Sequence, residues 1–398
     1  MNKTNNFAAS RRRVILASGG LYHFFHDSIA DGLTVLLPLW QIAFNLSLTH
    51  VGLIVTCFEG ATACFQIPAS FLGERFGERL LLSIGTLITA ISFISIGFAG
   101  SYFSLATILL IGGFAAGVQH PLSSSLISRT YKDRGHRMAL GSYNFAGDVG
   151  KFAFPALAAM VLSIIDWRFL CIGYGLFGCI ITIGLYGLLK RFNAGEIESY
   201  KKDMDGHQSI GSWGIENKRA FSILSVIGFI DTGVRIGLST FIPFLLIKKG
   251  ISVESVGFAI SLLFVGGAIG KFLCGVIAER VGITTSIVIT EFITGGGILM
   301  LIKMPMPIIY IFLPILGAAL NGTSTVLYGA VSDFVLPRQI ARSFGLFYTF
   351  VIAAAAVAPP IFGVISDLSG IANTIRLIGL CALTPIPLAY MLSRCMNS

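Results

Sequence analysis

The chain alternates between long apolar runs and short polar connections. A helix needs about 20 mostly apolar residues to cross the hydrocarbon core of a bilayer, and twelve of the runs are that long. Their approximate limits are 14–44, 50–72, 80–99, 103–128, 138–164, 169–190, 220–247, 255–278, 284–302, 306–332, 341–366 and 371–394. The pattern predicts an all-α membrane protein with twelve transmembrane helices, divided into six and six by one longer polar connection.

The positions of Lys and Arg predict how the chain is oriented. If the N-terminus is cytoplasmic, twenty of the 28 Lys and Arg residues fall on the cytoplasmic side, five on the other side and three within spans. Cytoplasmic loops carry such an excess of basic residues. We therefore expect a multi-pass protein of the cell (inner) membrane with both termini cytoplasmic. Its expected parts are an N-terminal six-helix bundle at 1–190, a cytoplasmic loop at 191–219 and a C-terminal six-helix bundle at 220–398.

Composition supports this class of protein and excludes several others. Hydrophobic residues make up 55% of the chain and charged residues only 12%, whereas soluble domains are about 25% charged. Soluble multidomain proteins, disordered chains and nucleic-acid-binding proteins are thereby excluded. The seven cysteines are odd in number and contain no C-x-x-C pair, so we expect reduced packing residues, with no disulfide framework and no metal site.

The two halves repeat at an offset of 204–205 residues. Gly73-Glu74-Arg75-Phe76-Gly77 corresponds to Ala278-Glu279-Arg280-Val281-Gly282, Asp27 to Asp231 and Pro155 to Pro359. Parallel repeats of this kind place a substrate site between the halves, near the middle of the bilayer. The repeat therefore predicts two six-helix pseudo-repeats around a central cavity.

Ionisable residues within spans are costly and are functional candidates by default. His23, Asp27 and Asp31 follow one another at intervals of four, so they lie along one stripe of the first helix. A carboxylate shielded from water can take or release a proton near neutral pH. We expect Asp27 or Asp31 to carry a coupling proton, with His23 as a relay.

Other polar residues within the spans are candidates for substrate binding. Guanidinium and ammonium groups suit carboxylate or phosphonate oxygens, so three cations within the spans predict an anionic group on the substrate. The predicted substrate-binding residues are Arg235, Asp231, Lys151, Asp148, Lys271, Gln119, His120 and Asn144. Two readings stay open, because Asp148–Lys151 and Asp231–Arg235 are also spaced to form intrahelical ion pairs that only neutralise buried charge.

The loop after the second span resembles a signature of the major facilitator superfamily, Gly-x-Leu-Ala-Asp-Arg-x-Gly-Arg-Lys. This chain reads Ser70-Phe71-Leu72-Gly73-Glu74-Arg75-Phe76-Gly77-Glu78-Arg79, and Gly275 to Gly282 is a second copy. The resemblance implies a cytoplasmic gate formed by Glu74, Arg75, Glu279 and Arg280. Gly117-Val118-Gln119-His120-Pro121 and Gly141-x5-Gly147-x2-Gly150 are similar to the fosmidomycin-resistance type of efflux transporter, where small or apolar residues usually stand at Asp148 and Lys151.

The residues and the resemblance together favour a proton-coupled secondary transporter that exports a small amphiphilic or anionic compound by alternating access. The alternative is a transporter of a polyanionic metabolite or a carboxylate siderophore, in either direction. We expect no enzymatic activity, no cofactor, no bound metal and no nucleic-acid partner. By the superfamily's usual form, we expect a monomer within the lipid bilayer.

Overall fold

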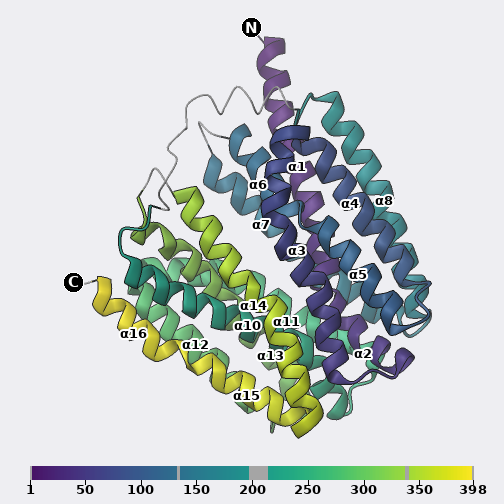
Figure 1. Cartoon of the computed structure of the whole chain (residues 1–398), viewed down its shortest axis with the longest axis vertical. Helices are drawn as coiled ribbons and strands as arrows, with labels where there is room; N and C mark the ends of the chain where they lie inside the picture. Colours follow the sequence, from purple (N-terminus) through teal and green to yellow (C-terminus); the bar gives the residue numbers. More distant parts are fainter. Residues whose placement is uncertain (1, 132–134, 197–213, 337–339, 397–398) are drawn as a thin grey trace. The chain divides into compact units, whose positions relative to one another are not determined.

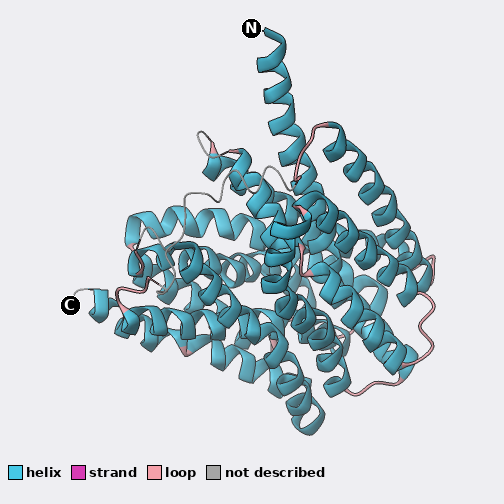
Figure 2. Ribbon diagram, turned by 45° about the horizontal axis from the view of Figure 1, so that its top comes forward, coloured by secondary structure: helices cyan, strands magenta, loops and turns pink. Residues whose placement is uncertain are grey.

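The computed structural model describes residues 2–131, 135–196, 214–336 and 340–396. Within these ranges every regular element is a helix (Figure 2), and the antiparallel pairing of Ile215 with Val335 is an isolated bridge. The all-α fold class predicted from the sequence is confirmed. The predicted division into 1–190, 191–219 and 220–398 stays a prediction, and residues 197–213 of the central loop lie outside the described residues.

By their internal contacts, the helices form two compact units. The first unit takes Met1–Leu33 and Cys57–Gln208, and the second takes Thr34–Thr56 and Ser209–Ser398. The first unit contains α1 (Asn2–Ala30), most of α3 (Leu48–Phe76), α4 (Glu78–Ile96), α5 (Tyr102–Ala116), α6 (Gln119–Thr130), α7 (His136–Val161) and α8 (Trp167–Arg191). The second unit contains α2 (Leu33–Phe44), the start of α3, α10 (Lys218–Lys248), η1 (Val253–Ser255), α11 (Val256–Val281), α12 (Ile283–Leu301), α13 (Met306–Ala330), η2 (Val331–Phe334), α14 (Ile340–Ser369), α15 (Ile371–Leu383) and α16 (Pro385–Met396).

Helix pairing is similar in the two units. In the first unit α1 packs on α7, and α4 packs on α5 and α8. In the second unit α10 packs on α14, and α12 packs on α13 and α15 (Figure 1). These are the pairs that an offset of about 204 residues relates, so the packing repeats along with the sequence.

Asp367 of α14 explains why the first turn of α3 belongs to the second unit and not to the first. Its carboxylate accepts hydrogen bonds from the backbone N–H of Leu48 at 2.8 Å and of Thr49 at 2.9 Å. The hydroxyl of Thr49 also donates to it, at 2.5 Å. The first N–H groups of a helix lack partners within the helix, so a carboxylate from a neighbouring helix satisfies them.

Ten helices of the described chain are long and apolar enough to cross a membrane. The expected spans that are not among these ten are the first, which is α1 with α2, and the fifth, which is α7. The first is divided, and its second part, α2, has only 12 residues; α1 and α7 carry the polar residues singled out above. The two spans that fall outside these ten are therefore the ones that carry His23, Asp27, Asp148 and Lys151.

Three spans expected to be continuous helices are interrupted, one of them being 371–394, which breaks at Thr384 between α15 and α16. The span 14–44 breaks at Asp31-Gly32, between α1 and α2, and the span 103–128 breaks at Gly117-Val118, between α5 and α6. Glycine weakens a helix but allows close packing. A Cβ on Gly32 would lie 2.4 Å from the Phe154 ring, and one on Gly117 would lie 2.8 Å from the Thr62 carbonyl. The interruptions at Gly32 and Gly117 therefore occur where another helix comes too close for a larger residue.

A buried ion pair fixes the start of α4. Glu78 is only 1% exposed, pairs with Arg129 of α6 and accepts a hydrogen bond from Ser125 at 3.0 Å. Glu78 replaces a basic residue of the superfamily signature, and the spacing along the chain gave no indication of its partner. Glu78 thus departs from the signature, and Arg129 on another helix balances its charge.

We expect Arg129→Ala to lower the free energy of unfolding by about 3–5 kcal/mol, because it leaves the Glu78 carboxylate buried without a counter-charge. The measurement is unfolding of the purified protein in detergent. Arg75→Ala is the matched control, since Arg75 is exposed near the same end of the bundle. Equal stability of the two variants would show that the ion pair contributes nothing.

Candidate functional site

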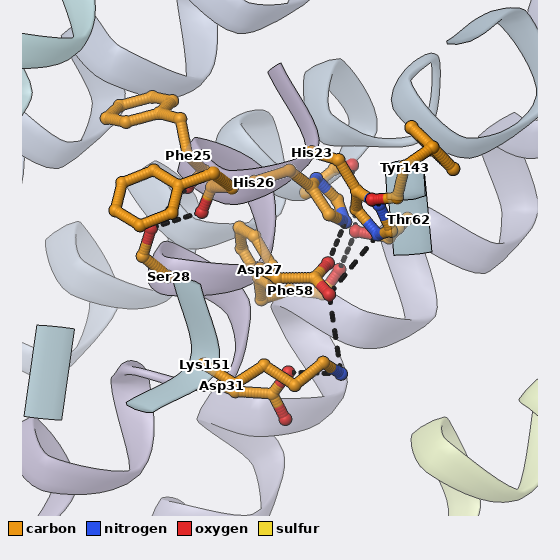
Figure 3. Close-up of polar contacts among 12 residues, drawn as sticks. His23, Phe25, His26, Asp27, Ser28, Asp31, Phe58, Thr62, Tyr143 and Lys151 are labelled. Atoms are coloured by element: carbon orange, nitrogen blue, oxygen red, sulfur yellow. Dashed lines mark hydrogen bonds and ion pairs between the residues drawn. The ribbon is translucent and has the colours of Figure 1, made fainter. Parts of the chain in front are cut away.

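A polar cluster lies at the centre of the first unit, on one stripe of α1. Asp27 is 5% exposed, and His23 and His26 are also buried. The spacing of four residues places the His23 and Asp27 side chains together, and α6 and α7 pack against the same face of α1. Figure 3 shows His23, Asp27, Asp31 and Lys151 pointing toward one another.

The hydrogen bonds of His23 determine where a proton must lie. Its Nδ1 is 2.9 Å from the backbone oxygen of Tyr143, and because a carbonyl oxygen only accepts, Nδ1 must carry the hydrogen. Its Nε2 is 3.2 Å from Oδ2 of Asp27. Without a further proton, this contact would set a nitrogen lone pair against a carboxylate oxygen. One proton therefore belongs between Nε2 and Oδ2, either on the imidazole or on the carboxyl group.

Lys151 of α7 joins both carboxylates of the stripe. Its ammonium nitrogen is 2.8 Å from Oδ2 of Asp31 and 3.5 Å from Oδ2 of Asp27 (Figure 3). The sequence left Asp148 open as an intrahelical partner of Lys151 and allowed pairing across helices. The structure shows the pairing across helices, from α7 to α1. Asp27 and Asp31 are thus linked through one shared cation.

His120 of α6 brings two histidines of α1 into one group. Its ring lies 5.0 Å from the His23 ring and 4.7 Å from the His26 ring, edge-on in both cases. Nε2 of His26 is 3.9 Å from the other oxygen of Asp27. The ring of Tyr143 stacks on His23 at 4.1 Å. Asp27 is therefore surrounded by three imidazoles and an ammonium group.

Gly147 of α7 forms the wall beside the shared proton. A Cβ at this position would lie 2.6 Å from Nε2 of His23 and 2.7 Å from Oδ2 of Asp27, which are the two atoms that face each other. Gly147 belongs to the glycine pattern of α7 identified from the sequence. The fold therefore gives a specific reason for glycine at this position, since a methyl group would press on both atoms.

The cluster was also tested as a metal centre. One donor atom each from His23, Asp27 and His120 lie within 4.8 Å of one another, and imidazole and carboxylate are common ligands of transition metals. However, the Lys151 ammonium contacts the same carboxylate oxygen that a metal would share with His23. A divalent ion beside that charge would be repelled, so the residues suit a proton better than a metal.

The second unit contains its own buried carboxyl pair. Asp231 of α10 is 4% exposed and Glu291 of α12 is 1% exposed, so both carboxyl groups are buried. Arg235 is close enough to act electrostatically on Asp231. Sequence reasoning placed Asp231 and Arg235 in the substrate site and gave Glu291 no role. The signal available for Glu291 was its position in the middle of an apolar span.

The other predicted residues are spread over both units. Asp148 is buried on α7, Asn144 on the same helix is exposed, and Lys271 on α11 is half-buried. Gln119, at the start of α6, is buried, and neither atom of its amide group has a hydrogen-bond partner among the described residues. Their substrate-binding roles stay predictions.

The predicted gate residues also stay predictions. Glu74 is half-buried on α3, and the exposed Arg75 lies over the ring of Phe76 at 5.4 Å. Glu279 and Arg280 are exposed at the end of α11.

Comparisons with known proteins identify the family to which this chain belongs. The fosmidomycin resistance protein of Escherichia coli (strain K12) is 22% identical over 386 residues, covering 94% of this chain and 90% of that protein. The probable L-galactonate transporter of the same strain is 22% identical over 252 residues, covering 59% of this chain and 54% of that protein.

A likeness in structure extends over nearly the whole chain. A bacterial homologue of the human lysosomal transporter Spinster, solved inward-facing and unoccupied, has a TM-score of 0.80 at 17% identity. The match covers 97% of this chain and 98% of that one, and it shows the fold. The sequence pattern of the Major Facilitator Superfamily matches residues 18–245 and 221–394. The chain therefore belongs to the major facilitator superfamily.

Proposed function

We propose that this membrane transporter is coupled to protons and exports a small amphiphilic or anionic compound by alternating access. The observation that carries the proposal is the contact between His23 and Asp27, which needs one proton between Nε2 and Oδ2. The contact is buried in a span that is otherwise apolar. A proton held there is the kind of ligand that a secondary transporter exchanges between the two sides of a membrane.

Lys151 connects the proton to the substrate. An anionic substrate that pairs with the ammonium group would draw it away from Asp27, which at 3.5 Å is the more distant of its two carboxylates. Asp27, having lost that neighbouring cation, then takes the proton shared with His23. Release of the anion reverses the steps, so binding of the anion and protonation of Asp27 are coupled through one lysine.

The names of two relatives support an anionic substrate. Fosmidomycin is a phosphonate and L-galactonate is a sugar acid, so both compounds carry oxyanions that an ammonium group can bind. A phosphonate or similar drug leaving the cell is our leading candidate. The galactonate relative favours a carboxylate metabolite as the second candidate.

The proposal also covers the membrane location, the orientation and the oligomeric state of the protein. The excess of Lys and Arg on one side supports an inner-membrane protein with both termini cytoplasmic. We propose a monomer, which is the usual form of the superfamily to which the chain belongs.

We expect Lys151→Gln to weaken anion binding at least about tenfold, which corresponds to about 1.4 kcal/mol and is within the range of a charge-assisted hydrogen bond. Thermal stabilisation of the purified protein by fosmidomycin and by galactonate is the measurement, with a quaternary ammonium dye as the cationic comparison. Lys303→Gln is the control, since Lys303 is exposed at the end of α12. Stabilisation by the dye alone, unaffected by Lys151→Gln, would contradict an anionic substrate.

A further inference from the structure

Two polar side chains of α6 are buried without a polar group to pair with them. Gln119 is 2% exposed and Ser123 is 0% exposed. Neither atom of the Gln119 amide group, nor the Ser123 hydroxyl, has a hydrogen-bond partner among the described residues. Buried polar side chains are normally hydrogen bonded to the protein or to ordered water, because an unpaired polar group in an apolar interior is costly. The two residues therefore need a partner that the described side chains do not supply.

Both side chains face the interface that α6 forms with α1 and α4. Gln119, Ser123 and Ile127 follow one another at intervals of four, so they form one stripe of α6. The Ile127 end of the stripe packs on α1, where a Cβ on Gly19 would lie 2.8 Å from the Ile127 side chain. The helix α6 also packs against α4. The stripe therefore turns its amide and its hydroxyl group into the bundle, away from the lipid.

Tyr22 of α1 and Ser83 of α4 add two hydroxyl groups to the same interface. Tyr22 is 0% exposed and lies three residues after Gly19, on the face of α1 that meets α6. Its hydroxyl oxygen is 2.9 Å from Oγ of Ser83. One of these hydroxyls donates to the other, so the one that accepts still has its own hydrogen to donate. The Ser18 hydroxyl, one turn earlier on α1, is also buried and has no hydrogen-bond partner among the described residues.

A partner for these groups must be small, uncharged and able both to donate and to accept hydrogen bonds. The apolar side chains that cluster with Tyr22 here are at most 5% exposed, so a substrate-sized molecule has no entrance; they are Leu82, Val118, Leu122 and Leu126. The amide and hydroxyl groups are neutral, so they offer an ion no counter-charge. A buried water molecule makes about three hydrogen bonds to otherwise unpaired polar groups, and this interface supplies that number.

We propose that Gln119, Ser123 and the neighbouring hydroxyl pair bind ordered water between α1, α4 and α6. His120 follows Gln119 on α6 and contacts two histidines of α1, so the water site lies beside the polar cluster around Asp27. Lys151 reaches that cluster from another helix, α7. Water at α6 therefore offers the histidines a proton donor and acceptor at a place that an anion bound to Lys151 does not occupy. This role rests on the proposed function, whereas the water site itself does not.

X-ray radiolysis of the full chain in lipid tests the inference directly, because hydroxyl radicals formed from a bound water modify the side chains that the water touches, even buried ones. Mass spectrometry should find Tyr22 modified although it is 0% exposed. Ser123→Ala and Gln119→Leu should each abolish this modification, since they remove partners of the water without adding charge. Ser124→Ala is the matched control and should keep it, because Ser124 is half-buried and lies about 100° further around α6.

Thermal unfolding of the same variants gives a second, independent result. In a dry interface, Ser123→Ala and Gln119→Leu would each remove an unpaired buried polar group and raise the melting temperature. With water bound, each removes a hydrogen bond and lowers the melting temperature. Asp27→Asn should leave the modification of Tyr22 unchanged, so a failure of proton coupling and a failure of the water site are distinguished. An unmodified Tyr22 in the wild type, or a higher melting temperature of Ser123→Ala, would overturn the proposal.

Discussion

Asp27→Asn is expected to abolish proton-coupled transport while leaving the protein folded. Asparagine has the shape of aspartate but cannot take a proton, so the exchange between His23 and residue 27 stops. We expect the substrate gradient that a pH gradient can build to fall by about 5- to 150-fold, the range given by a coupling free energy of about 1–3 kcal/mol. Transport into vesicles with an imposed pH gradient is the measurement.

Asp31→Asn distinguishes the two carboxylates that share Lys151. Asp31 lies 2.8 Å from the ammonium nitrogen, and His23 is paired with Asp27 instead. We expect Asp31→Asn to weaken substrate binding, since Lys151 loses its closer anchor, while proton movement continues. If Asp31→Asn stops proton movement and Asp27→Asn does not, the assignment of the proton to Asp27 is wrong.

Gly147→Ala is expected to have the second-largest effect on transport. The added methyl group would lie 2.6 Å from His23 Nε2 and 2.7 Å from Asp27 Oδ2, so it must push these two atoms apart. Overpacking of this kind costs about 1–3 kcal/mol, which a membrane bundle can tolerate, but the shared proton loses its second partner. We expect coupled transport to fall at least about tenfold while the protein remains folded.

Gly141→Ala is the matched control for this substitution. It lies on α7 as well, and a Cβ there would meet nothing within 4 Å. The control should keep both transport and thermal stability. Normal coupling in Gly147→Ala would show that the close approach of α7 to His23 and Asp27 has no role in transport.

Much of the fold could be predicted from the sequence because a bilayer imposes simple rules. The length and apolarity of the runs predicted an all-α membrane protein, and the repeat offset related Asp27 to Asp231. The spacing of His23, Asp27 and Asp31 predicted one stripe; the structure keeps His23 and Asp27 on one face of α1, and Asp31, directly after its last residue, shares Lys151 with Asp27. These are local properties, so the sequence expresses them directly.

The partners across helices could not be predicted in the same way. Lys151 is 120 residues or more from the two carboxylates that it joins, and nothing in the local sequence indicates Asp27 and Asp31 as its partners. Glu78 was missed as a member of a buried pair for the same reason, since its partner Arg129 lies on another helix. The helix breaks at Gly32 and Gly117 were missed because they follow from close packing and not from proline.

The most direct test of proton coupling is proton movement in liposomes that contain the purified wild-type protein and a trapped pH dye. Fosmidomycin, galactonate and a quaternary ammonium dye would be added in turn, with Asp27→Asn liposomes alongside. The account predicts that an anionic compound drives a change of internal pH in the wild type and none in Asp27→Asn. Substrate movement with no change of pH, equal in the two proteins, would contradict it.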